Sequence, residues 1–221
     1  MKNNIPNITP KSSGLKISYA IPVCTEHKEI DKLLKILIGG IDIGEDEIVI
    51  QCDKGNTTPE VYKVLSKYPL VKIIEFPLNG DFASFKNNLK NNCIGDWIFQ
   101  IDADEYPNEN LLLNLKEILK LNPTTEMFLV PRVNTVEGLT QEHINKWQWR
   151  VDNNNWVNWP DYQTRIIQNN PKIQWASKVH EVIVGHNGFA PLPMEEKWCL
   201  YHHKHINKQE FQNNLYDNLA K

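Results

Sequence analysis

The chain has 221 residues, enough for one large domain or for one domain with a small annex. Its formal net charge of −3, without any basic run, gives it no electrostatic reason to bind nucleic acid. An apolar fraction of 41% predicts a substantial core, yet no apolar stretch is long enough to form a transmembrane segment.

The N-terminal residues 1–14 are polar and lack the apolar segment of a signal peptide, so we expect a flexible tail. Cys24, Cys52, Cys93 and Cys199 are far apart and have no metal-type spacing among themselves. We interpret them as reduced thiols in a reducing compartment. These features predict a cytoplasmic protein, and leave peripheral association with a membrane open.

In the first half of the chain, segments with strand character alternate with segments of helical periodicity. After Glu26, for example, Ile30, Leu33, Leu34 and Leu37 share one helical face. The predicted strands are 15–23, 47–52, 71–76 and 97–101, and the predicted helices are 26–40, 59–68, 82–93 and 107–121. This alternation favours an α/β fold with a parallel sheet covered on both faces.

Ligands of such sheets bind beyond the carboxyl ends of the strands. The loops that follow Val23, Cys52 and Ile101 should therefore share one crevice.

The pattern changes after a strand predicted at 127–130. Few helical periodicities occur from Pro131 to Pro193, and five of the seven tryptophans lie there: Trp147, Trp149, Trp156, Trp159 and Trp175. Short strands are predicted at 163–168, 173–175, 179–184 and 198–203, before a last helix with Phe211, Leu215 and Leu219 on one face. We divide the chain into a first half, 15–130, a second half, 131–206, and a C-terminal helix, 207–221.

The segment from Gly95 to Glu105 ends a predicted buried strand in a cluster of carboxylates. Asp102, Asp104 and Glu105 lie within four positions, and carboxylates this close repel one another unless a cation lies between them. Mg²⁺ is typically held by one or two carboxylates together with phosphate oxygens. The alternative is a solvated acidic turn before a helix that starts near Pro107.

Six segments, taken in order, resemble the GT-A-fold glycosyltransferases of family 2. They are Ala20–Glu26, Asp53–Thr58, Phe82–Asn87, Asp96–Glu105, Asp161–Arg165 and Val179–Glu181. The resemblance covers about residues 16–211. It implies a Rossmann-like, mostly parallel sheet flanked by helices, with a nucleotide-sugar-binding first half and an acceptor-binding second half.

The resemblance also implies an activity. Similar proteins are inverting glycosyltransferases that use Mn²⁺ or Mg²⁺ to move a sugar from a nucleoside diphosphate donor, most commonly a UDP-sugar. The acceptor would be a hydroxyl of a glycan, lipid or protein. The donor-binding positions it implies are Pro22, Val23, Glu26, Asp53, Lys86, Asp102, Ala103 and Arg165.

Two departures from the family pattern affect these expectations. Lys86 stands where arginine is more usual, so a point charge replaces a planar fork. The loop from Gly55 to Glu60 lacks the Gly-Ser and second aspartate that often occur there.

Arg165 is expected either to clamp the diphosphate or acceptor or to form a structural ion pair.

The resemblance implies that Asp104 binds the metal. Asp102 would either lie nearer the ribose or support the residues that bind the ion without touching it. A histidine near the metal or diphosphate is also expected, and His202 or His203 would take that place. Two alternatives exist for these histidines. They could form a zinc site with Cys199, or they could be ordinary exposed residues of the surface.

Inverting transfer needs a base that takes the proton of the acceptor hydroxyl. We expect this base to be Glu181, with Asp161 as the alternative; Glu181 could instead pair with Lys178 or Arg165. Aromatic faces stack on sugar rings, so Trp156, Trp159 and Trp175 are candidates for an acceptor wall, with core packing as the competing interpretation.

Two other functions fit parts of the sequence. One is a catalytically inactive nucleotide-sugar-binding protein of the same fold. The other is a Mg²⁺-dependent nucleotidyltransferase, which would need a glycine-rich, basic phosphate loop after the first strand. The segment Pro22–Glu26 has neither a glycine nor a basic residue, which disfavours the second.

Overall fold

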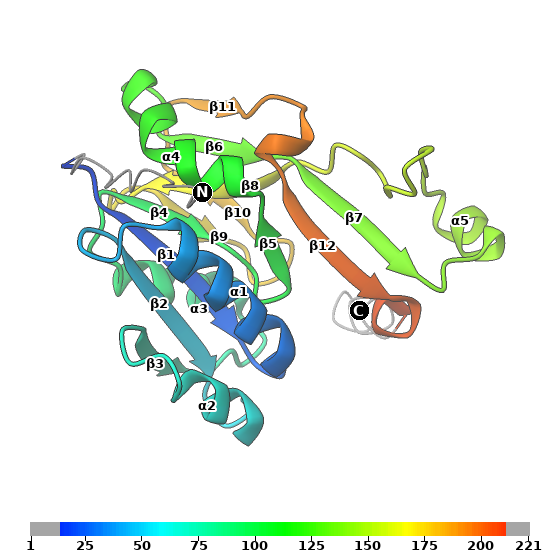
Figure 1. Ribbon diagram of the computed structural model, residues 1–221, viewed down its shortest axis with the longest axis horizontal. Helices are drawn as coiled ribbons and strands as arrows, with labels where there is room; N and C mark the ends of the chain where they lie inside the picture. The colour runs from blue at the N-terminus through cyan, green and yellow to red at the C-terminus, as the bar shows by residue number, and fades with distance from the viewer. Residues whose placement is uncertain (1–13, 211–221) are drawn as a thin grey trace, which may run out of the picture.

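The computed structural model describes residues 14–210. Its centre is a seven-stranded sheet with the strand order β11-β6-β8-β4-β1-β2-β3 (Figure 1). The strands are β1 (Ile17–Val23), β2 (Glu47–Asp53), β3 (Lys72–Phe76), β4 (Trp97–Gln100), β6 (Met127–Val130), β8 (Gln163–Gln168) and β11 (Phe189–Pro191). β1 pairs in parallel with β2 and β4, β2 pairs in parallel with β3, and β8 is antiparallel to β4 and β6. The sheet is therefore mostly parallel, as expected.

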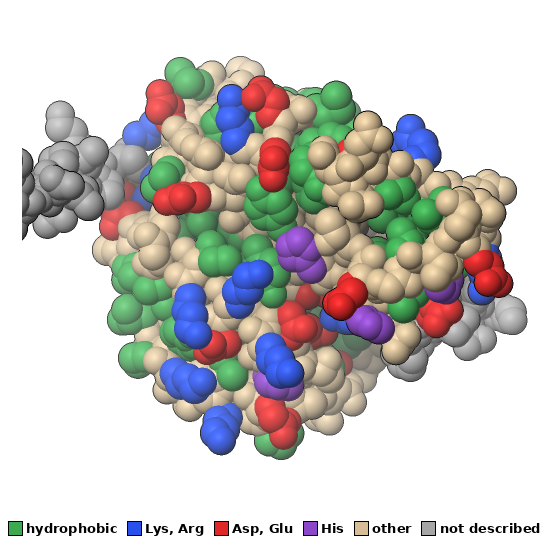
Figure 2. Space-filling model, turned by 45° about the vertical axis from the view of Figure 1, so that its right-hand side comes forward, with side chains coloured by type: hydrophobic (Ala, Val, Ile, Leu, Met, Phe, Trp, Pro, Cys, Tyr) green, Lys and Arg blue, Asp and Glu red, His purple; other side chains and the backbone are tan. Residues whose placement is uncertain are grey.

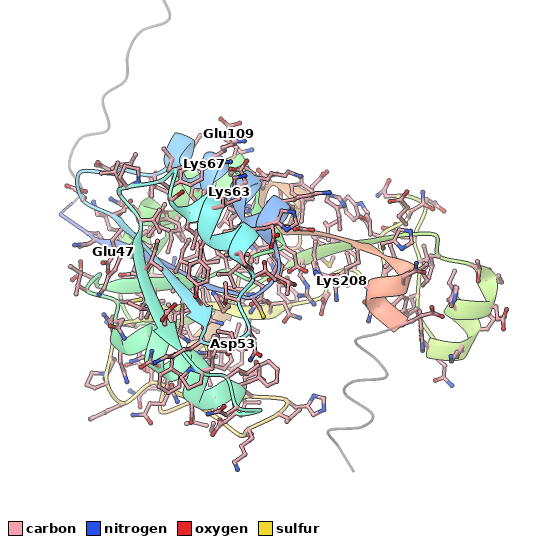
Figure 3. All side chains as sticks on the ribbon, turned by 90° about the horizontal axis from the view of Figure 1, so that it is seen from below. Glu47, Asp53, Lys63, Lys67, Glu109 and Lys208 are labelled. Atoms are coloured by element: carbon pink, nitrogen blue, oxygen red, sulfur yellow. The ribbon has the colours of Figure 1, made fainter. Side chains whose placement is uncertain are left out.

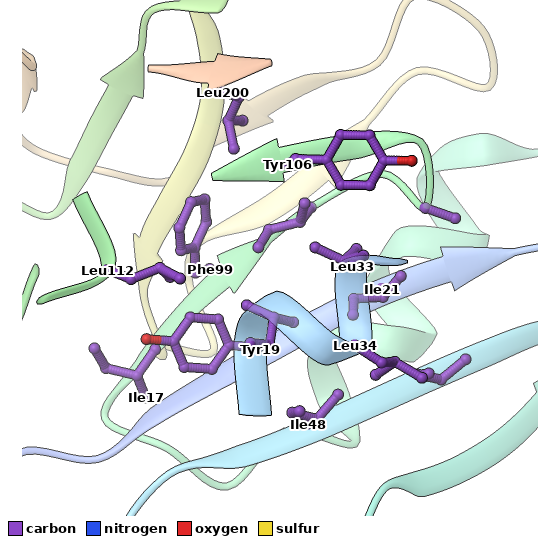
Figure 4. Close-up of a cluster of buried hydrophobic side chains, with 14 of the residues drawn as sticks. Ile17, Tyr19, Ile21, Leu33, Leu34, Ile48, Phe99, Tyr106, Leu112 and Leu200 are labelled. Carbon is purple, nitrogen blue, oxygen red and sulfur yellow. The ribbon is translucent and has the colours of Figure 1, made fainter. Parts of the chain in front are cut away.

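Alternating side chains of β1 build a core on each face of this sheet. Tyr19 and Ile21 pack among the buried residues of α1 (His27–Gly40), α2 (Pro59–Leu65) and α4 (Glu109–Leu121), as Figure 4 shows for part of the cluster. Ala20 faces the other side, where α3 (Phe82–Asn91) and the hairpin of β9 (Gln174–Ala176) and β10 (Val182–Val184) cover the sheet. Both faces are thus buried, as parallel sheets require.

Gly95 allows the start of β4 to approach β1 closely. A Cβ at this position would lie 2.7 Å from the backbone nitrogen of Ser18 and 2.8 Å from its Oγ. The Gly95 N–H instead donates to Ser18 Oγ at 2.8 Å. The register places Ala20 opposite Gln100, the last residue of β4, and the acidic segment begins just beyond it.

A second sheet has three strands, in the order β5-β12-β7, and extends away from the central sheet (Figure 1). It consists of β5 (Glu105–Pro107), β12 (Leu200–His205) and β7 (Arg132–Glu137). β12 is antiparallel to β5 and parallel to β7, which places His202 opposite both Glu105 and Asn134. This sheet connects the acidic segment to the C-terminal part of the chain.

Several predicted boundaries were wrong. The helix expected from Pro107 begins at Glu109, because Pro107 pairs with Leu200 and the Oδ1 atom of Asn108 caps the helix at the amide of Asn110, 2.9 Å away. β12 begins at Leu200 because a short 3₁₀ helix, Glu196–Trp198, precedes it. The strand expected at 179–184 is limited to β10.

The elements β7, β11 and α5 (Gln141–Trp147) were not predicted. None of the residues of α5 is buried, and a capping box between Thr140 and His143 starts the helix. Residues 206–210 are helical, and the rest of the expected C-terminal helix lies outside the described residues. Within residues 14–210, no helix combines the length and apolar character needed to cross a bilayer. The four cysteines are free thiols.

Candidate active site

A cavity of about 510 Å³ opens at the carboxyl ends of β1, β2 and β4. The three loops that the sequence placed in one crevice all line it. The predicted site residues in its lining are Pro22, Val23, Glu26, Asp53, Lys86, Asp102, Ala103, Asp104, Arg165, Glu181 and His202. Asp161 and His203 lie outside its lining. On the face shown in Figure 2, acidic, basic and histidine side chains lie intermixed.

The carboxylate of Glu26 holds the first loop, which follows β1, in place. Glu26 Oε2 accepts hydrogen bonds from the amides of Cys24 at 3.0 Å and Thr25 at 2.9 Å. At the end of β2, the buried Asp53 accepts from the Leu78 amide at 2.9 Å and from Asn56 Nδ2 at 3.0 Å. These contacts fix the two loops on that side of the cavity.

Glu105 is the most deeply buried acid of the site, with a side chain that is 0% exposed. Its Oε1 atom accepts from Arg165 Nη2 at 2.7 Å and from Arg132 Nη1 at 2.8 Å, and its Oε2 atom accepts from the amide of Asp102 at 3.2 Å. Burial would raise the pKa of Glu105, but Arg165 and Arg132 outweigh it and hold the pKa below its usual value. The sequence pattern assigned no role to Glu105 or Arg132.

Arg165 on β8 joins Glu105 to the acidic segment. Its Nη2 atom also donates to Asp102 Oδ2 at 2.5 Å, and its side chain is 4% exposed. The sequence left open whether Arg165 clamps the diphosphate or acceptor or forms a structural ion pair. Its contacts in the structure are those of an ion pair with Asp102 and Glu105. The Nε atom of Arg165 is buried and has no hydrogen-bond partner within the described residues.

Asp161 accepts hydrogen bonds on both of its oxygens. Oδ2 accepts from Arg132 Nε at 2.9 Å and from Asn134 Nδ2 at 2.8 Å, and Oδ1 accepts from Gln163 Nε2 at 2.8 Å. Burial opposes the charged form, but Arg132 and the two amides lower the pKa of Asp161. A carboxylate with these partners is a weak proton acceptor.

His202 and Asp104 face each other across one wall of the cavity, with His202 Nε2 3.5 Å from Asp104 Oδ2. Because the carboxylate of Asp161 only accepts, the Asn134 amide turns its nitrogen toward Asp161 and its oxygen toward His202 Nδ1, 2.9 Å away. Nδ1 therefore carries a proton, and the other ring nitrogen, Nε2, faces Asp104.

This arrangement fits a divalent cation. A carboxylate oxygen and an imidazole nitrogen converge, and the histidine is oriented by a hydrogen bond at its other nitrogen, as metal-binding histidines usually are. Within residues 14–210, no three His, Cys, Asp or Glu side chains form a preformed metal cage. Two protein ligands are nevertheless enough for Mg²⁺-type sites, where phosphate oxygens complete the coordination.

His203 points away from this wall, as alternation along β12 requires. Its Nδ1 atom forms a hydrogen bond with Thr135 Oγ1, and its ring stacks on Tyr201 with centroids 6.4 Å apart. Desolvation and the nearby Lys32 lower the pKa of His203. Of the two histidines proposed for the metal, the cavity contains His202.

Glu181 pairs with Lys86 rather than with Lys178 or Arg165. The side chains of Glu181 and Lys86 are 16% and 12% exposed, and Lys86 Nζ lies 4.3 Å from the centroid of the Trp175 ring. Trp175 is therefore a buried support beneath the lysine rather than an open aromatic wall.

The turn that carries Glu181 has an unusual backbone. Ser177 and His180 have φ values of 74° and 55°, a region that non-glycine residues rarely occupy. The amide of Phe82 donates to the carbonyl of Lys178 at 2.9 Å and ties the turn to the start of α3. Strained backbone of this kind is often found at functional sites.

A second cavity of about 200 Å³ adjoins the first. The two cavities share Arg132, His202, Lys204 and Gln209 in their linings. Trp149 lines the second cavity together with Asp161 and several polar side chains. Trp149 packs on Trp147, with ring centroids 4.6 Å apart, and Trp156 packs on Trp159, 5.0 Å apart. Trp156 and Trp159, unlike Trp149, line neither cavity.

Comparisons with known proteins agree with this architecture. The sequence model of the family described as Glycosyl transferase family 2 matches residues 18–182. S. aureus TarS 1–349 in complex with UDP is 17% identical, with a TM-score of 0.62 over 86% of this chain and 60% of the TarS 1–349 chain. The same TarS fragment with UDP-GlcNAc is 17% identical, with a TM-score of 0.60 over 86% of this chain and 59% of that chain.

Glucosyl-3-phosphoglycerate synthase from Mycobacterium tuberculosis, in complex with Mn²⁺, UDP and phosphoglyceric acid, is 15% identical, with a TM-score of 0.45 over 57% of this chain and 45% of that one. No curated protein sequence matches this chain. The chain spans about 60% of the TarS 1–349 chain. Since the family match covers most of its length, the chain belongs to glycosyl transferase family 2.

Proposed function

We propose that the chain is a metal-dependent, inverting glycosyltransferase that moves a sugar from a nucleoside diphosphate donor to a hydroxyl of a glycan, lipid or protein acceptor. The observation that carries this proposal is the convergence of Asp102, Asp104, Lys86, Glu181 and His202 on one cavity in a member of this family. The TarS complexes with UDP and UDP-GlcNAc support a UDP-sugar as the donor.

The nucleotide would bind between the loops that end β1 and β2. Pro22 and Val23 form one side of this part of the cavity, and Asp53, already fixed by Leu78 and Asn56, faces it. Asp102 and Ala103 lie next along the wall, where the ribose would bind.

Asp104 and His202 would hold Mn²⁺ or Mg²⁺ together with the diphosphate. The bound ion would act as a Lewis acid that neutralises the charge developing on the leaving diphosphate. Asn134 orients His202 through Nδ1, and Glu105 with Arg165 fixes Asp102 beside it. The site is thus largely preorganised before ligand binds.

Glu181 is the proposed base. It is a carboxylate in the cavity wall, and it is supplied by the second half of the chain, where the acceptor should bind. Lys86 holds its position through their ion pair. Asp161 is the weaker candidate, because its oxygens already accept hydrogen bonds from Arg132, Asn134 and Gln163.

The second cavity is the proposed acceptor subsite. It adjoins the donor cavity, and Trp149 offers an aromatic face among polar side chains, which is the composition that sugar-binding surfaces favour. Trp149 thus replaces Trp156, Trp159 and Trp175 as the preferred acceptor contact.

Asp104→Asn should abolish metal-dependent transfer, because the neutral amide supplies one weaker ligand and no compensating charge. Isothermal titration with UDP and Mn²⁺ should show at least a tenfold rise in Kd for a protein that remains folded. Normal turnover by this variant would contradict the metal assignment. A wild-type chain that binds UDP with Mn²⁺ but transfers no sugar would indicate the inactive binding protein instead.

Glu181→Gln should leave the Kd for UDP unchanged and lower kcat by about 10²- to 10⁴-fold, the range typical of a lost general base. Asp161→Asn is the matched control, since it removes the same charge from a residue outside the donor cavity. It should lower the thermal midpoint, because Arg132 loses a partner, and lower kcat much less. The reverse pattern would make Asp161 the base.

Trp149→Ala should raise the KM for the acceptor about tenfold, corresponding to loss of an aromatic contact, with little change in the KM for the donor. Trp156→Ala provides the control, because Trp156 packs on Trp159 and lines neither cavity. An equal or larger effect of Trp156→Ala on the acceptor KM would overturn the choice of Trp149.

A further inference from the structure

Lys208 lies on the helical turn that follows β12, on the same side of the molecule as the tip of β2 (Figure 3). Its Nζ atom is 2.9 Å from Asp104 Oδ2 and 4.0 Å from Glu26 Oε1. The Lys208 side chain is 37% exposed, whereas that of Asp104 is 14% exposed. The ammonium group of Lys208 therefore contacts Asp104, a largely buried acid of the donor cavity.

The oxygen that Lys208 contacts is also the one that faces His202. Asp104 Oδ2 is 3.5 Å from His202 Nε2 and 2.9 Å from Lys208 Nζ. A cation supplied by the chain therefore already lies against this carboxylate.

A divalent ion held by Asp104 would need the same negative charge. Two cations close to one carboxylate oxygen repel each other strongly in a partly desolvated cavity. The proposed metal and the ammonium group of Lys208 therefore exclude one another at Asp104 Oδ2, unless the lysine moves. Glu26, the other acid near Nζ, gives the displaced ammonium a second partner without any change in the fold.

We propose that Lys208 is the resident counter-ion of Asp104 and competes with the divalent ion for it. This inference rests on the metal site of the proposed function. Lys208 stabilises the acidic segment while no ion is bound, and it sets the affinity for the ion, because metal binding must break the Lys208–Asp104 pair. Lys208 is thus a positioning residue that acts through Asp104.

The test is Mn²⁺ binding to the whole 221-residue chain without nucleotide, measured by isothermal titration in low-salt buffer near neutral pH. Lys208→Gln should bind Mn²⁺ about two- to fivefold more tightly than the wild type, in line with the strength of a partly exposed ion pair. Lys208→Arg keeps the charge and should stay close to the wild type.

Lys35→Gln controls for the loss of one positive charge. Lys35 pairs with Asp31 at 2.5 Å on α1 and lines neither cavity, so this variant should bind Mn²⁺ like the wild type. Equal or weaker Mn²⁺ binding by Lys208→Gln, or an equal gain in Lys35→Gln, would overturn the competition.

Repeating the titrations with UDP separates the two proposals. Mn²⁺ binding by the wild type, combined with unchanged affinity in Lys208→Gln, refutes only the competition and leaves the metal site standing. Failure of both proteins to bind Mn²⁺, with and without UDP, refutes the metal site and the competition together. Tighter binding by Lys208→Gln supports both.

Discussion

The buried pairing of Glu105 with two arginines is the constraint on which the site depends. A carboxylate that is 0% exposed is tolerated only when charged partners and hydrogen bonds replace water. Each arginine contacts Glu105 and one further acid: Arg165 reaches Asp102, and Arg132 reaches Asp161. The buried carboxylate of Glu105 thereby holds in place an acid from each half of the chain. Without Glu105, each of the two arginines would lose one negatively charged partner.

The same network orients the proposed metal ligands. Asp161 sets the direction of the Asn134 amide, and that amide accepts from Nδ1 of His202, whose other ring nitrogen faces Asp104. An acid that is a poor candidate for the base thus has a clear structural role. The site combines rigid, internally paired side chains with one contact, between Lys208 and Asp104, that ligand binding would have to break.

Local sequence patterns were enough to predict the shared cavity, but not the contacts within it. The carboxyl ends of parallel strands meet at one edge of a sheet, so the order of the elements brings their loops together. The role of Glu105 was not predictable, because its partner Arg132 is 27 residues away and meets it only through the pairing of β5, β12 and β7. The turn before Glu181 was missed because no sequence pattern signals positive φ at Ser177 and His180.

The most direct test of this account is the affinity of Glu105→Gln for UDP in the presence of Mn²⁺, measured by titration well below the unfolding midpoint. Glu105 touches no part of the proposed donor site except through its arginines and the amide of Asp102. The account predicts a folded protein whose Kd is at least about tenfold higher, comparable to loss of a group that orients a metal ligand. A wild-type Kd in a folded Glu105→Gln protein would contradict it.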